Sequence, residues 1–141
     1  RKRHQVNKKT GQVRMFKGIK GVKSVFKDML RTKENNVCFG DDGQFRKNMP
    51  VFCSQFVREK GSNRIKTKIL TRDRDVSNSK GSTYRFVDKA TESNVAVNIY
   101  GDKINIIVWT DEPEAIIIEN ADAAKSFKAY FEFMWKSAKK K

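Results

Sequence analysis

The stretch VNIYGDKINIIVW, residues 97–109, decides the fold more than any other part of the chain. Apolar residues recur at every second position up to the Gly101-Asp102 pair, which favours two strands joined by a two-residue turn. A further apolar run, AIIIEN, follows a short turn that contains Pro113. We therefore predict an antiparallel meander of three consecutive strands, at 94–100, 103–109 and 115–120.

Within two of these strands, residues 106–109 and 116–118 are apolar at every position, so both faces of each strand are apolar. We therefore expect layers to cover both sides of the sheet. After them, apolar residues recur at helical spacing, which predicts a final helix with Asn120 as its N-cap. Its apolar stripe consists of Phe127, Tyr130, Phe131, Met134, Trp135 and Ala138.

The first half of the chain alternates strand patterns with helix patterns. A helix is predicted to start with Asn48 as N-cap and Pro50 in its first turn, and to stop at Gly61. We predict a mixed β-sheet of the α/β (α+β-like) class, in one domain at residues 12–141 after a basic tail or linker at 1–11. The remaining elements are strands at 12–16, 35–42, 65–71 and 82–87, a helix at 17–32 and a surface loop at 72–82.

The chain has 141 residues and a formal net charge of +15, distributed unevenly. Residues 1–33 hold twelve Lys and Arg against one acidic residue, Asp28, whereas residues 82–141 hold nine of each sign. Charge concentrated at one end is the electrostatic footprint of a polyanionic partner, most often nucleic acid. A solubilising surface is the alternative. An acidic membrane is a weaker one, because the apolar face of the first helix is expected to join the core.

Other features of the composition narrow the class of protein. Mean hydropathy is −0.72, and no apolar run approaches the ~20 residues of a membrane span. The chain opens RKRHQVNKK without the apolar stretch of a secretory signal, so we expect a cytoplasmic protein that does not contact a membrane.

Histidine occurs once, at His4 in the basic tail, which argues against catalysis by a positioned imidazole. Cys38 and Cys53 are predicted to be reduced core residues, and with His4 they do not make a zinc site. We expect no metal, no cofactor and no enzymatic activity.

Four segments carry a resemblance to a known family: VRMFKGIKGVKSVFKDML (13–30), VNIYGDKINIIVW (97–109), EPEAIIIEN (112–120) and the aromatic helix at 121–139. In this order they resemble the C-terminal regulatory region of archaeal transcriptional regulators of the TrmB type. The resemblance implies a degenerate phospholipase D-like fold. It also implies a homodimer, and a DNA-reading winged helix upstream of residue 1.

Active phospholipase D enzymes use a His-x-Lys pair followed by an Asp, with the His as nucleophile. The YGDK turn corresponds to the distal end of that motif and retains Asp102 and Lys103. The preceding segment, TESNVAVN at 91–98, contains no His. The resemblance therefore implies a fold kept after its chemistry was lost, and Gly-Asp is also what a tight hairpin needs.

Our first hypothesis is a non-catalytic regulatory and dimerisation domain of a DNA-binding transcriptional regulator. Its basic N-terminal third would contact nucleic-acid phosphates, which position a protein without reading bases. The predicted contact residues are Arg1, Lys2, Arg3, Lys8, Lys9, Arg14, Lys17, Lys20, Lys23 and Lys27.

Two other functions remain open. One is a sensor for a sugar or phosphorylated metabolite, with a pocket at the sheet edge near Asn98, Tyr100, Lys103 and Trp109. The other is a phosphodiesterase or nuclease, for which Asp73, Asp75 and Asp88 are the only loosely grouped carboxylates.

Overall fold

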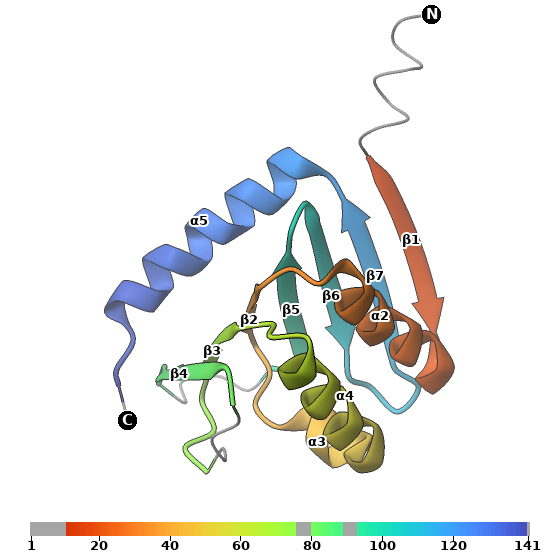
Figure 1. The fold of residues 1–141 in the computed structure, drawn as a ribbon, viewed down its shortest axis with the longest axis horizontal. Helices are drawn as coiled ribbons and strands as arrows, with labels where there is room; N and C mark the ends of the chain where they lie inside the picture. The colour runs from red at the N-terminus through yellow and green to blue at the C-terminus, as the bar shows by residue number, and fades with distance from the viewer. Residues whose placement is uncertain (1–10, 76–79, 89–92, 141) are drawn as a thin grey trace, which may run out of the picture.

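The computed structural model describes residues 11–75, 80–88 and 93–140. Strands and helices alternate in the first half, and three strands and a helix close the chain (Figure 1). The elements are β1 (Gln12–Lys17), α2 (Gly18–Thr32), β2 (Asn36–Phe39), α3 (Gln44–Asn48), α4 (Pro50–Ser62), β3 (Thr67–Thr71), β4 (Ser82–Phe86), β5 (Val95–Tyr100), β6 (Lys103–Val108), β7 (Glu114–Glu119) and α5 (Ala121–Ser137).

The strands form one 7-stranded mixed sheet in the order β1-β7-β6-β5-β2-β3-β4. Strands β5, β6 and β7 make the predicted antiparallel meander, and Gly101 turns the first hairpin with a φ of 59°. Strands β2, β3 and β4 pair in parallel, while β1 pairs antiparallel with β7 at one edge. The prediction of a mixed sheet is therefore confirmed.

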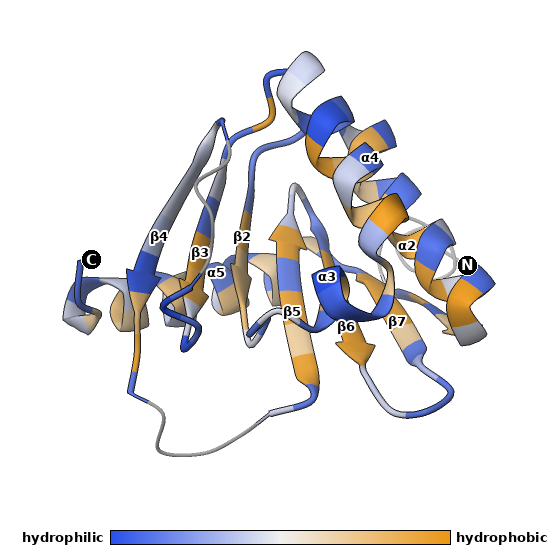
Figure 2. Cartoon of the chain, turned by 90° about the horizontal axis from the view of Figure 1, so that it is seen from below, coloured by the Kyte–Doolittle hydropathy of each residue, from blue (hydrophilic) through white to orange (hydrophobic). Residues whose placement is uncertain are grey.

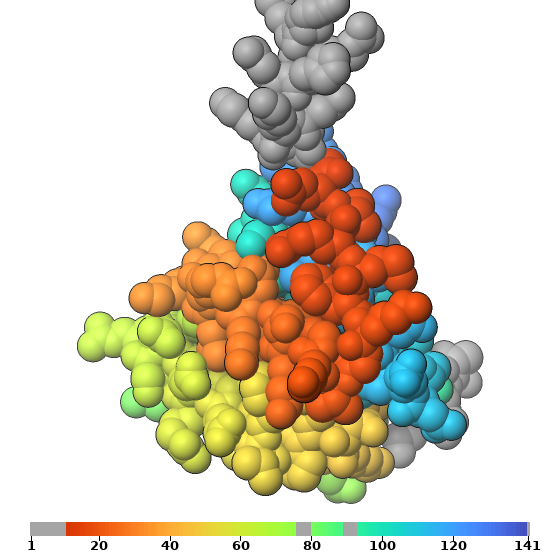
Figure 3. Space-filling view, turned by 90° about the vertical axis from the view of Figure 1, so that its right-hand side faces the viewer, coloured from red at the N-terminus to blue at the C-terminus, as the bar shows by residue number. Residues whose placement is uncertain are grey.

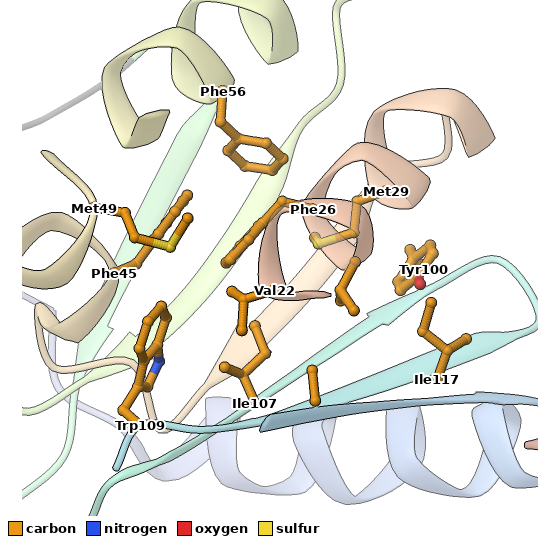
Figure 4. Packing of buried hydrophobic residues seen from close by; sticks show 12 residues of the cluster. Val22, Phe26, Met29, Phe45, Met49, Phe56, Tyr100, Ile107, Trp109 and Ile117 are labelled. Atoms are coloured by element: carbon orange, nitrogen blue, oxygen red, sulfur yellow. The ribbon is translucent and has the colours of Figure 1, made fainter. Parts of the chain in front are cut away.

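Helices α2, α3 and α4 cover one face of the sheet, and aromatic side chains fill the space between them (Figure 4). The rings of Phe26 and Phe45 stack with centroids 3.8 Å apart, and Phe56 meets Phe26 edge-on. Beneath them, Ile107 and Ile117 rise from the sheet. This cluster fixes α2 and α4 side by side.

Helix α5 covers the opposite face (Figure 2). Phe131 and Trp135 of α5 are buried against Val97, Ile99 and Ile104. The helix starts as predicted, because the Asn120 side chain accepts a hydrogen bond from the Ala123 amide at 3.0 Å. The predicted layer on each side of the sheet is confirmed.

Three local predictions are wrong. Asn48 does not cap α4: it ends the short helix α3, its side chain donates to the Gln44 carbonyl, and Met49 is the N-cap. Gly61 does not stop α4, which runs one residue further. Tyr130 is not part of the buried stripe of α5, because it is 63% exposed.

In the described residues, no helix has both the length and the hydropathy to cross a membrane. Cys38 is buried in β2 and Cys53 is half-buried in α4, and both are free thiols. Burial raises the pKa of the Cys53 thiol to about 11.

Candidate nucleic-acid interface

Helix α2 separates an apolar face from a basic one. Val22, Val25, Phe26 and Met29 are buried under the helix, and the charged residues Lys20, Lys23 and Lys27 lie off that face at a spacing of three and four residues. Within the described chain, none of these three lysines forms an ion pair. Their ammonium groups are therefore available to an anionic partner.

A groove of about 550 Å³ runs between α2 and α4. Lys23, Lys27 and Arg31 follow one another at intervals of four residues along its α2 wall, and Lys33, the C-cap of α2, also lines the groove. In the same groove, the Lys23 ammonium lies 5.7 Å from the centroid of the Phe52 ring on α4. Figure 3 shows β1, α2 and α4 together on one face of the molecule.

The opposite wall of the groove belongs to α4 and is nearly neutral. Gln55 and Asn63 contribute amides, and Glu59 is the one acidic residue among those that line the groove. Four cations line the groove, and one of them, Arg31, pairs with the Asp28 carboxylate. The three remaining lysines outnumber Glu59 and make the groove electropositive, which suits a row of phosphates.

Asp28, the single acidic residue of the first 33, does not offset this charge at the surface. It is 3% exposed and points into the protein, where the Tyr100 hydroxyl donates to its Oδ2 at 2.9 Å. The Lys103 ammonium donates to both carboxylate oxygens, at 3.2 and 3.1 Å, and Arg31 donates to Oδ1 at 2.9 Å. The cluster ties α2 to β5 and β6.

The same contacts set the ionisation of Asp28. Burial alone raises the pKa of this carboxyl, but hydrogen bonds from Tyr100 and Lys103 and the charge of Lys103 outweigh it, so the pKa falls below its ordinary 3.8. Burial and the neighbouring Asp28 charge raise the pKa of Tyr100. Asp28 therefore stays ionised and Tyr100 stays a donor at neutral pH.

The predicted phosphate-contact residues fall into two sets. Arg14 and Lys17 of β1 are exposed beside α2, with the Arg14 guanidinium 5.7 Å from the Phe16 ring centroid. Figure 3 shows β1 and α2, the two elements that carry five of the predicted residues, side by side on one face of the molecule. The other five, Arg1, Lys2, Arg3, Lys8 and Lys9, lie outside the described residues.

The sequence reasoning missed Arg31 and Lys33 as members of this face. A usable signal was present, because Lys23, Lys27 and Arg31 recur every fourth residue and such residues share one side of a helix. The contribution of α4 could not be found in this way, since it depends on how the two helices pack.

The four residues proposed for a ligand pocket do not lie together. Tyr100 and Lys103 belong to the Asp28 cluster, while Trp109 is 6% exposed and stacks near Phe45. Asn98 lines a separate cavity under α4. The expected position at a sheet edge is wrong, because β5 and β6 are interior strands.

The structure also places the carboxylates considered for phosphodiester chemistry. Asp102 lies in the β5–β6 turn, where its carbonyl accepts from the Asn120 amide at 3.0 Å. Asp73 accepts from Arg46 at 3.3 Å and from the Asp75 amide at 2.9 Å. Within the described ranges, no three His, Cys, Asp or Glu residues gather as a metal site.

Neither a protein-family model nor a curated protein sequence matches the chain. Among solved structures, TrmBL2, an archaeal chromatin protein described with a novel mode of DNA binding, matches with a TM-score of 0.62 at 20% identity. That match covers 92% of this chain and 54% of TrmBL2, so the chain spans about half of its length.

Two further solved structures also match. NucT from Helicobacter pylori has a TM-score of 0.67 at 10% identity, over 93% of this chain and 99% of NucT. Nuc from Salmonella typhimurium, a phospholipase D family member, has a TM-score of 0.64 at 12% identity, over 92% of this chain and 97% of Nuc. The chain therefore has the phospholipase D-like fold, as the resemblance of its sequence to TrmB-type regulators implies.

Proposed function

We propose that this domain binds DNA through the phosphate backbone and serves, without catalysis, as a regulatory and dimerisation domain of a DNA-binding regulator. The observation that carries the proposal is the basic groove between α2 and α4. Arg31 pairs with the buried Asp28, but Lys23, Lys27 and Lys33 form no ion pair among the described residues. Cations along a groove supply sequence-independent affinity for a duplex.

TrmBL2 supports the choice of DNA as the polyanion, because it shares this fold and is described with a mode of DNA binding. Base reading would then belong to a winged helix upstream, with the α2–α4 groove holding the flanking backbone. In this arrangement the domain adds affinity and fixes orientation, while sequence preference comes from elsewhere.

The absence of catalysis is supported by the composition of the chain. A covalent phosphohistidine intermediate needs an imidazole, and the sequence has only His4, far from the β5–β6 hairpin in the chain. Lys103, the retained lysine of the motif, donates to Asp28 and so has a structural partner.

Fluorescence anisotropy with a labelled 30-bp duplex tests DNA binding. If about six phosphates are engaged, affinity should fall roughly a thousandfold between 50 and 200 mM salt. Replacing Lys20, Lys23 and Lys27 with Gln should lower the salt slope by about three. The matched control replaces Lys125, Lys128 and Lys136 of α5 with Gln, which changes the net charge equally on the other side of the sheet.

Two results would contradict the proposal. One is a flat salt response of the wild-type protein. The other is an equal loss of affinity in the α2 and α5 variants, which would show that net charge matters and the groove does not. Sustained release of nucleotides from plasmid DNA by the purified protein would separately overturn the non-catalytic part.

The proposed homodimer has its own support in strand β1. This edge strand exposes Val13 and Met15, at 61% and 62%, on the sheet face that carries Ile118 of the neighbouring β7. Sedimentation velocity should give a dimer mass, and Met15→Lys should shift it toward the monomer. A monomer at all concentrations of the wild type would contradict it.

A further inference from the structure

A cavity of about 400 Å³ lies between α4 and the parallel part of the sheet, apart from the basic groove. This volume is within the range of sites for small organic molecules. Phe26, Phe56 and Val57 supply its apolar wall. Its other wall is made by side chains of β2, β3, β4 and β5.

The sheet wall carries a polar row fixed by strand register. Asn36 of β2 is paired with Thr67 of β3, and Thr67 is paired with Ser82 of β4, so the three side chains lie side by side in the cavity wall. The Thr67 hydroxyl donates to Asn36 Oδ1 at 2.6 Å. Polar side chains in a row are unusual in a parallel sheet, whose buried strands normally consist of apolar residues.

The ammonium group of Lys60 on α4 lies against this row, and the residue is 5% exposed. It donates to Thr67 Oγ1 at 2.6 Å and to Ser82 Oγ at 3.3 Å. Among the residues that the structure describes, no carboxylate pairs with it. A buried cation held only by hydroxyl groups is destabilising, and an anion nearby would offset its charge.

The rest of the wall does not supply that anion. Asp41 is the one carboxylate among the residues that line the cavity, and its Oδ1 accepts from the Gly43 amide at 3.0 Å. Burial raises the pKa of Asp41, which disfavours its charged form. Arg46, which pairs with Asp73, and Arg58, which forms no ion pair among the described residues, also line the cavity, so the site as a whole favours negative charge.

We propose that this cavity binds a small organic anion, with its carboxylate or phosphate at the Thr67–Ser82 wall that the Lys60 ammonium contacts and its apolar part against Phe26 and Phe56. The Ser82 hydroxyl donates to the anionic group, and the neighbouring Lys60 ammonium, held in place by Thr67 Oγ1, supplies the charge. The aromatic wall selects a compact apolar or aromatic body.

Benzoate and phenyl phosphate are suitable probes, with benzamide as the neutral probe of matched shape. Titration of ¹⁵N-labelled protein should shift the amides of Thr67, Ser82 and Asn98. Benzamide should bind at least tenfold more weakly than the better anion, and the ranking of the two anions shows whether the site takes a carboxylate or a phosphate.

Lys60→Met should remove the preference for an anion. Lys68→Met is the matched control, because Lys68 follows Thr67 on β3 but lies over the Trp135 ring of α5, on the other side of the sheet.

The proposal is overturned if benzamide binds as tightly as the anions, if Lys60→Met retains the preference, or if neither anion binds. Shifts confined to α2 and the groove side of α4 would also overturn it, since they would show anion binding at the phosphate groove. Should Lys60→Met not fold, Thr67→Val tests the same wall and should weaken both anions. DNA affinity of the Lys60 variant should equal that of the wild type, so failure here is distinguishable from failure of the DNA-binding function.

Discussion

Asp28 and Lys60 are buried charges with different surroundings. Asp28 accepts hydrogen bonds from a tyrosine, a lysine and an arginine, so its charge is compensated. Among the partners that the structure describes, Lys60 has only two hydroxyl groups, so its charge is not compensated there. The first arrangement favours the folded state and the second opposes it, and this difference can be measured by pH-dependent unfolding.

Asp28→Asn should lower the free energy of unfolding at pH 7 by about 3 kcal/mol, because it leaves Lys103 without its buried partner. The folded-state pKa of Asp28 lies below the ordinary 3.8. The ionised carboxylate therefore stabilises the folded state fully above pH 3.8, and this stabilisation is lost as the pH falls through the lowered pKa. Urea unfolding from pH 7 to pH 2 should show the gap between wild type and variant closing at the acidic end. A gap that does not change with pH would show that the contribution is packing and not charge.

Lys60→Met should increase the free energy of unfolding at neutral pH. Burial lowers the pKa of Lys60 from its ordinary 10.5, so the folded state carries a penalty at every pH where the lysine must stay protonated, and the penalty disappears as the pH rises to 10.5. The gain of the variant over wild type, measured by urea unfolding, should therefore shrink from pH 7 to pH 10.5. A variant less stable than wild type at pH 7 would contradict this account.

At the scale of elements, the contact between α2 and β1 depends on a glycine. A Cβ atom at Gly21 would lie 2.9 Å from the backbone carbonyl carbon of Phe16, whereas one at Gly61 in α4 would meet nothing within 4 Å. Both glycines are helical, so propensity alone predicts that alanine stabilises each helix by up to about 1 kcal/mol. Thermal unfolding should show Gly61→Ala more stable than wild type and Gly21→Ala less stable. Equal gains for both would show that α2 can move off β1 without loss.

Elements with a clear hydrophobic period were predictable from the sequence. The β5–β6–β7 meander, helix α2 and the Asn120 cap follow from alternation, from helical spacing and from a capping residue. Helix α3 was missed because it has 5 residues and one buried side chain, Phe45, which is too short for a period to show. Tyr130 was misplaced because α5 crosses the sheet at an angle that spacing along one helix does not fix.

The candidate site was predictable only where it lies on one element. The basic stripe of α2 can be read from charges at helical spacing, but the groove needs α4 beside it. The cavity under α4 was not predictable at all, because Asn36, Thr67 and Ser82 become neighbours only through strand order. That order is set by long-range pairing of β2, β3 and β4, which local patterns do not encode.

At the scale of the whole molecule, the sheet separates two surfaces of different character. One carries α2 and α4 with the basic groove, and the other carries α5, whose exposed side presents Tyr130 and Phe133. Since salt screens exposed charges over about 10 Å at 0.1 M, phosphates held in the groove are screened from lysines across the sheet. On the proposed function, we therefore expect charge to direct a duplex to the groove surface only.

This asymmetry predicts which backbone amides a bound duplex protects. Hydrogen–deuterium exchange at low salt, with and without a 30-bp duplex, should slow in α2 and α4, because the groove is covered and local opening of those helices is restrained. Exchange in α5 should not change. The protection should vanish when salt is raised to about 0.5 M, since the counterions released by binding then compete effectively. If α5 were protected as strongly as α2, the groove would not be the DNA-binding surface, whatever the overall affinity.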